Sequence, residues 1–278
     1  MGPTRLGFLT LTWAKRRLAA GGGVRARLAL VAGALIAFAA GCAAPRNTVT
    51  QISTIDALLA GVYDGQMPCR NLAQYGDLGI GTFDRLDGEL VLLDGRVFRV
   101  KADGKASPAE TTATTPFAAV VRFQPQVIQR LVSGTTFSGF QEQVNALATN
   151  RNVFCAMRVK GKFRSVKTRS VPSQTKPYPP LVEVTRNQPV FDHADMEGTL
   201  LGFRLPDYVK GINVPGFHLH FLSADHEAGG HALDFTLDEG TIELAPCYQL
   251  QLLLPKDQSA FGQIDFSRDR SKELEQVE

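Results

Sequence analysis

Four of the five histidines in the chain fall within a stretch of fourteen residues, and three of them, His218, His220 and His231, have a spacing that could bring them together. His218 and His220 are two residues apart in an apolar run with the alternation of a strand, so both side chains leave the same face. Residues 223–230 form a polar segment that ends in two glycines, which predicts a reversal that brings His231 opposite the pair. Three imidazoles on one side of a hairpin suit zinc and leave one position for water or substrate.

The alternative is that these histidines are ordinary packed or surface residues, as a single histidine in a strand usually is. The third histidine after a tight reversal favours the metal site. His226 lies in the turn and is expected to face water, and nothing in the sequence links His193 to the cluster. Zinc held by three neutral ligands keeps its full charge and polarises a carbonyl or hydroxyl group strongly.

Two further residues are candidates for chemistry beside such a metal. Glu89 opens a strongly apolar strand, and the alternative is an exposed carboxylate at the strand edge. Arg169 ends a strand before a proline-rich loop, where a fixed guanidinium could bind a carboxylate through two hydrogen bonds. The alternative for Arg169 is a solvated charge.

The elements that position these residues are mostly strands. Asp94-Gly95 is a strong hairpin signal between two strand-like segments. Strands that follow one another in hairpin order favour mixed or antiparallel sheets with a few helices. The pattern predicts helices at 54–63, 72–77, 125–135 and 138–147, and strands at 80–83, 89–93, 96–100, 117–123, 153–159, 163–169, 178–186, 198–204, 214–222, 231–237 and 241–253.

The first forty-one residues have the pattern of an export signal. A basic segment precedes the apolar run 28–40, and Ala39-Ala40-Gly41-Cys42 follows it. The cysteine after small residues resembles a bacterial lipobox, although Ala39 stands where leucine is usual. We therefore predict a lipoprotein-type signal at 1–41, lipidation of Cys42 and a tether at 42–52; the alternative is a soluble protein released by cleavage nearby.

Composition excludes some classes of function. The net charge is +3, and the basic residues form no stripe with interleaved aromatic residues, so nucleic acid is not an expected partner. The remaining cysteines, Cys69, Cys155 and Cys247, match no zinc or disulfide framework.

Several long motifs resemble the α-acetolactate decarboxylase family, and they follow one another in order from about residue 55 to the C-terminus. They lie at 61–65, 79–83 with 86–89, 166–169 with 176–181, 198–206, 213–222 and 229–234. The resemblance implies roles for individual residues: zinc ligation by His218, His220 and His231, an active-site glutamate at Glu89, an active-site arginine at Arg169, a pocket threonine at Thr82, and a tail glutamate at Glu278 with Glu275 as second choice.

The resemblance also implies an α/β (α+β) fold of two packed domains, which we place at 53–155 and 156–278, and a homodimer. The implied reaction is zinc-dependent decarboxylation of 2-acetolactate to acetoin, with the metal stabilising an enediolate. Two alternatives stay open: an exported zinc hydrolase, although no His-Glu-x-x-His is present, and a non-enzymatic periplasmic zinc-binding lipoprotein, although no His-rich acidic loop is present. The leader predicts a periplasmic or cell-surface location, with membrane contact only through the lipid anchor.

Overall fold

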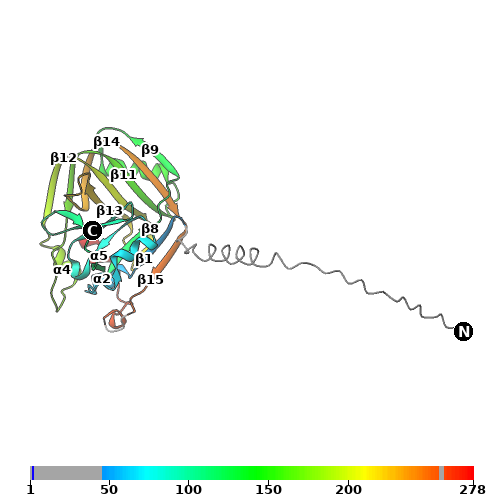
Figure 1. Cartoon of the computed structure of the whole chain (residues 1–278), viewed down its shortest axis with the longest axis vertical. Coiled ribbons are helices and arrows are strands. Elements are labelled where there is room, and N and C mark those ends of the chain that lie inside the picture. The colour runs from blue at the N-terminus through cyan, green and yellow to red at the C-terminus, as the bar shows by residue number, and fades with distance from the viewer. Residues whose placement is uncertain (1, 3–45, 257–259) are drawn as a thin grey trace, which may run out of the picture. The chain divides into compact units, whose positions relative to one another are not determined.

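The computed structural model describes residues 2, 46–256 and 260–278, and the fold lies in one compact unit, Ala44–Glu278. Strands dominate this unit (Figure 1). The expectation of mixed, largely antiparallel sheets with few helices is confirmed. Cys42 and the predicted signal at 1–41 lie outside the described residues, apart from Gly2. In the part of the chain that is described, no helix is long and apolar enough to cross a membrane.

The first sheet has seven strands, and its one parallel pair joins two distant segments of the chain, β1 and β15. Asp94 and Gly95 both have positive φ and form the predicted tight turn between β4 and β5. In spatial order the strands are β15 (Gln249–Leu253), β1 (Thr48–Ile52), β8 (Phe117–Val121), β3 (Leu78–Thr82), β4 (Glu89–Leu93), β5 (Arg96–Val100) and β6 (Ala106–Pro108).

The second sheet is built from long antiparallel strands. Its strands are β10 (Thr135–Thr136), β14 (Gly229–Cys247), β11 (Phe154–Arg169), β12 (Val190–Leu205) and β13 (Gly216–Ser223), with β9 (Val127–Leu131) on β14. β13 pairs with β12 along its length and with β14 at His220, Phe221 and Leu222, so four strands close on themselves. A separate two-stranded sheet pairs β2 (Met67–Pro68) with β7 (Thr114–Thr115).

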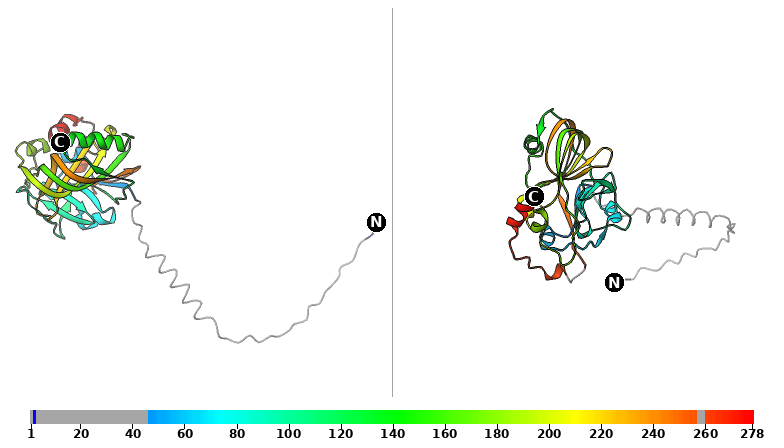
Figure 2. Two further views of the ribbon diagram at one scale, coloured as in Figure 1. Left: turned by 90° about the horizontal axis from the view of Figure 1, so that it is seen from above. Right: turned by 90° about the vertical axis from the view of Figure 1, so that its left-hand side faces the viewer.

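The helices are short and cover the ends and faces of the sheets. Thr54 and Thr136 each accept a hydrogen bond from a backbone N–H of the first turn and so cap α2 and α3. The left view of Figure 2 shows α3, in green, lying along the strands of the second sheet. The helices are α2 (Ile55–Leu59), α3 (Phe137–Leu147), α4 (Leu181–Thr185) and α5 (Ser271–Val277), with 3-10 turns η1 (Cys69–Gln74), η2 (Asp84–Leu86), η3 (Asp207–Val209) and η4 (Phe261–Gln263).

Three clusters of buried side chains hold the site in place. One joins the two sheets through side chains such as Ile80 and Phe203. The second lies under α3, where Phe140 contacts Phe235 edge-on. The third packs α2, α4 and α5 against the ends of the first sheet. Each fully buried large apolar side chain contributes about 1.5–3 kcal/mol to stability relative to an exposed one, so these clusters stabilise the elements that carry the site.

Two predicted elements were wrong in type. Residues 125–135 were expected to be helical but contain β9, because their backbone pairs with β14 at Ile242 and its neighbours. Residues 178–186 were expected to be a strand but contain α4. Pro180 immediately precedes the first turn of α4, a position that tolerates the fixed φ of proline and its missing N–H group. Leu181 and Val184, three residues apart, lie on one face of the helix and are both buried.

Gly161 was expected to separate two strands, but β11 runs through it without a break. A Cβ at this position would lie 2.2 Å from the carbonyl oxygen of Glu239, so the glycine permits close approach of β14. Two strands were expected at 231–237 and 241–253. In the structure β14 runs through the first range and into the second as far as Cys247, and the rest of the second range is β15, which belongs to the first sheet. The domain boundary at 155 and 156 stays a prediction.

Candidate active site

The three clustered histidines meet on the β13–β14 hairpin. His220 pairs directly with His231 in the strand register, so the predicted reversal is confirmed. The ring centroids of His218, His220 and His231 lie 5.1–5.5 Å apart. One nitrogen of each ring lies within 4.8 Å of the others, and all three side chains are buried. Three converging imidazoles can hold one metal ion.

The hydrogen bonds of His220 leave one ring nitrogen suited to metal coordination. Nδ1 donates to the carbonyl oxygen of Leu90 at 3.0 Å, which fixes the tautomer. Nε2 is buried and has no hydrogen-bond partner among the described residues. Burial lowers the pKa of His220 to about 3 and holds the pKa of His218 and His231 well below the usual range. The imidazoles are therefore neutral, as zinc ligands must be, and the donor set fits zinc.

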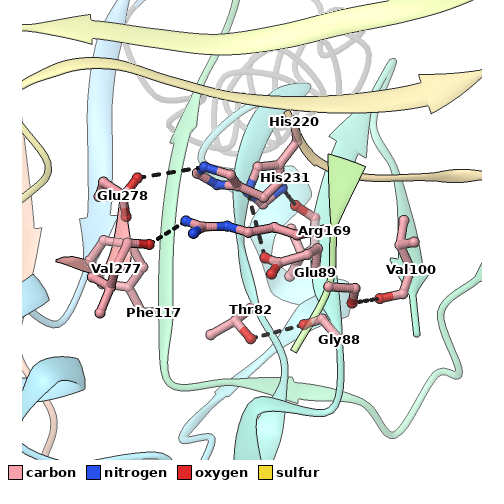
Figure 3. Close-up of polar contacts among 12 residues, drawn as sticks. Thr82, Gly88, Glu89, Val100, Phe117, Arg169, His220, His231, Val277 and Glu278 are labelled. Atoms are coloured by element: carbon pink, nitrogen blue, oxygen red, sulfur yellow. Dashed lines mark hydrogen bonds and ion pairs between the residues drawn. The ribbon is translucent and has the colours of Figure 1, made fainter. Parts of the chain in front are cut away.

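The β3–β4 connection places Thr82 and Glu89 beside the histidines. The two residues are direct partners in the strand register. The hydroxyl of Thr82 donates to the carbonyl oxygen of Gly88 at 2.9 Å (Figure 3). Gly88 has φ +96°, and a Cβ there would lie 2.3 Å from the carbonyl oxygen of Val100, so this tight turn requires glycine.

The carboxyl group of Glu89 is buried and lies close to the histidine cluster. Its Oε2 lies 3.6 Å from Nε2 of His220. Burial raises the pKa of Glu89 to about 8, although the charge of Arg169 opposes this effect, and the charge of Glu278 adds to it. The structure thus places Glu89 inside the site and not at an exposed strand edge.

Arg169 ends β11 and is only 7% exposed. It lies opposite His231 in the register, and its guanidinium donates to the carbonyl oxygen of Val277 (Figure 3). Its positive charge lowers the pKa of the neighbouring carboxyl groups of Glu89 and Glu278. Arg169 therefore connects the hairpin that carries the three histidines, the first sheet and the C-terminal segment.

The C-terminal helix α5 brings Glu278 to the histidines. Oε2 of Glu278 lies 3.7 Å from Nε2 of His231, and its side chain is 22% exposed although the residue as a whole is exposed. Burial of the carboxyl group raises the pKa of Glu278 to about 7. Glu275, the second choice for the tail glutamate, is exposed and does not line the cavity among the described residues.

One cavity contains all seven residues predicted for the site, together with an apolar wall that the sequence analysis missed. The wall comes from α2, η2, β8, α4 and α5, which bring together segments far apart in the chain. Its members have no sequence signal beyond ordinary hydrophobicity, and the polar Gln188 beside them was missed too. The wall residues are Ile55, Leu58, Leu86, Phe117, Leu181 and Val277, together with Val171 from the loop after β11.

The other two histidines lie apart from the cavity, as expected. His226 packs its ring on Phe98, with centroids 4.5 Å apart, and is half-buried instead of facing water. His193 shares a hydrogen bond of 3.1 Å with the hydroxyl of Thr168. Cys69, Cys155 and Cys247 are free and buried.

Fold and site together define a protein that can hold a metal ion beside two buried carboxyl groups and an arginine. The sequence matches the family description α-acetolactate decarboxylase over residues 49–268. It is similar to the α-acetolactate decarboxylase of Methylococcus capsulatus, with 44% identity over 84% of this chain and 89% of that protein. It is 40% identical to that of Bacillus licheniformis over 80% of this chain and 87% of the relative.

Solved structures agree with the sequence comparison. The crystal structure of α-acetolactate decarboxylase from Bacillus subtilis strain 168 superposes with a TM-score of 0.81 and 37% identity, covering 83% of this chain and 99% of that one. The chain belongs to the α-acetolactate decarboxylase family and is a carboxy-lyase.

Proposed function

We propose that this protein is a zinc-dependent enzyme that decarboxylates 2-acetolactate to acetoin and CO2. The observation that carries the proposal is Nε2 of His220, which is buried within the histidine cluster, has no hydrogen-bond partner among the described residues and lies beside two carboxyl groups and a buried guanidinium. Family membership supports the substrate, and the neutral nitrogen donors support zinc.

When bound, zinc supplies positive charge that stabilises the negative charge developing on substrate oxygens. The protein's own residues supply orientation. Arg169 presents its guanidinium to the substrate carboxylate, which places the bond to be broken beside the histidine cluster. Because Arg169 is held by Val277 and buried, little freedom is lost when the substrate binds.

Loss of CO2 leaves the bonding electron pair on the substrate, so one proton must be delivered to carbon. In the metal-free protein burial raises the pKa of Glu89 to about 8, so it is mainly protonated at neutral pH, and burial raises the pKa of Glu278 to about 7, so it exchanges its proton near neutrality. A bound cation lowers both pKa values toward neutrality or below, where a carboxyl group exchanges protons readily. Either residue can serve as the donor from its side of the cavity. The apolar wall accommodates the methyl groups and excludes water.

An assay of acetoin and CO2 release from racemic 2-acetolactate tests this function. The purified protein should be active, lose activity with a chelator and regain it with zinc. Ester hydrolysis without acetoin formation would favour the zinc hydrolase. Tight zinc binding without turnover would favour a binding protein. Family membership argues against both alternatives.

We further propose export, lipidation of Cys42 and assembly as a homodimer. Support for export is the basic and apolar leader that ends in Cys42. A lipobox cysteine that carries two or more acyl chains anchors a protein stably. Intact-mass analysis of the membrane fraction should show acylation that Cys42→Ser abolishes, and an unmodified thiol would refute the anchor. Light scattering of the released enzyme should give twice the chain mass if it is a dimer.

A further inference from the structure

Gln188 lines the cavity but has no part in the roles assigned above. It lies between α4 and β12, close to the end of β11. The next residue, Pro189, accepts a hydrogen bond from the backbone N–H of Ser170 at 3.3 Å, and Val190 pairs with Arg169. Gln188 is therefore held near the guanidinium that would bind the substrate carboxylate.

The amide oxygen of Gln188 is buried and has no hydrogen-bond partner among the described residues. A buried acceptor left unpaired costs about 1–3 kcal/mol, so native proteins keep few of them. Neighbouring hydroxyl donors are already engaged: Thr82 donates to Gly88, and Thr185 donates to Val182 at 3.4 Å. The guanidinium of Arg169 donates to Val277, and none of its N–H groups donates to the amide oxygen of Gln188. A ligand that brings its own donor would satisfy this oxygen.

The substrate has one such donor. At neutral pH 2-acetolactate is a carboxylate with a ketone and a tertiary hydroxyl, and only the hydroxyl can donate. The hydroxyl and the carboxylate share one carbon atom, so an acceptor near Arg169 is well placed to meet it. We propose that Gln188 accepts a hydrogen bond from the substrate hydroxyl and thereby selects 2-hydroxy acids. This inference rests on the proposed function.

Two carboxylates that differ only in the hydroxyl isolate this contact. 2-Hydroxyisobutyrate carries the hydroxyl and isobutyrate lacks it. Calorimetry with the zinc-loaded protein gives the ratio of their dissociation constants. In Gln188→Leu this preference for the hydroxy acid should fall roughly three- to tenfold, the value of one hydrogen bond. Part of the preference will persist, because zinc also binds hydroxyl oxygen.

Three further variants control the measurement. Gln188→Glu keeps an acceptor and should keep the ratio, although its charge weakens both ligands. Gln188→Met has similar length and should behave as Gln188→Leu, which guards against a folding defect in one variant. Thr185→Val removes an already paired hydroxyl from the same cavity and should leave the ratio unchanged.

The outcome separates this inference from the proposed function. A ratio that stays within twofold of the wild-type value in both Gln188→Leu and Gln188→Met overturns the role of Gln188, even if acetoin is released normally. Wild-type protein that releases no acetoin refutes the decarboxylase proposal, whatever the ratio. A lower preference for the hydroxy acid in the Leu and Met variants alone, with acetoin released by the wild type, supports both the role of Gln188 and the decarboxylase function.

Discussion

Replacing Arg169 by lysine separates the charge of this residue from its geometry. Lysine keeps the positive charge that lowers the pKa of Glu89 and Glu278, so the acid–base groups should change little. It loses the planar arrangement of donors. In the wild type one guanidinium can contact both the carbonyl oxygen of Val277 and a substrate carboxylate through different N–H groups. The single nitrogen of a lysine ammonium group lacks this fixed pair of donor positions.

The expected loss is one charge-assisted hydrogen bond. Such a bond contributes about 1.5–3 kcal/mol, which corresponds to a decrease of roughly 10- to 150-fold in kcat/KM. The assay is steady-state acetoin formation, combined with zinc analysis and thermal unfolding. Because Arg169 is not among the three histidines that could hold the metal, zinc content should stay at the wild-type level.

Arg158→Lys is a matched control on the same strand. Arg158 pairs with Glu243 at 2.5 Å and Asp94 at 2.9 Å and does not line the cavity. The control should retain wild-type kcat/KM. If Arg169→Lys retains kcat/KM within twofold, or if Arg158→Lys loses as much as Arg169→Lys, then the guanidinium does not orient the substrate. Loss of zinc in Arg169→Lys would instead assign the arginine a structural role.

Three further predictions follow from the site. The His218→Ala/His220→Ala double variant should lose both zinc and activity, and full zinc occupancy by elemental analysis would contradict the ligand assignment. In metal-free protein the pKa of Glu89 is raised to about 8. The contribution of protonated Glu89 to the free energy of unfolding is therefore present at low pH and is lost as pH rises from about 4.5 through 8. Glu89→Gln should therefore gain stability relative to wild type over that range in urea unfolding, and a difference independent of pH would show that the burial argument is wrong. Glu278→Gln should lower kcat about 100-fold or more if it donates the proton, whereas the exposed Glu275→Gln should not; equal effects of the two would show that Glu278 is not the proton donor.

The sequence alone was sufficient for the parts of this protein that depend on local pattern. The alternation around His218 and His220 and the glycine-ended turn predicted a hairpin with His231 opposite, because side-chain direction in a strand has a period of two. The Asp94-Gly95 turn and the capped helix α3 were also readable, since each is specified by neighbouring residues. Motif resemblance named Thr82, Glu89 and Arg169 as members of one site.

Only the tertiary structure decided what surrounds those residues. The strand at 127–131 forms because β14 offers a partner, and no local pattern reveals that partner. The high pKa of Glu89 arises from burial, which depends on segments far apart in the chain. Likewise, the unpaired oxygen of Gln188 and the placement of Glu278 instead of Glu275 result from how α4 and α5 pack. Residue type and spacing determined the candidate metal ligands of the site, whereas burial and long-range packing determined its electrostatics.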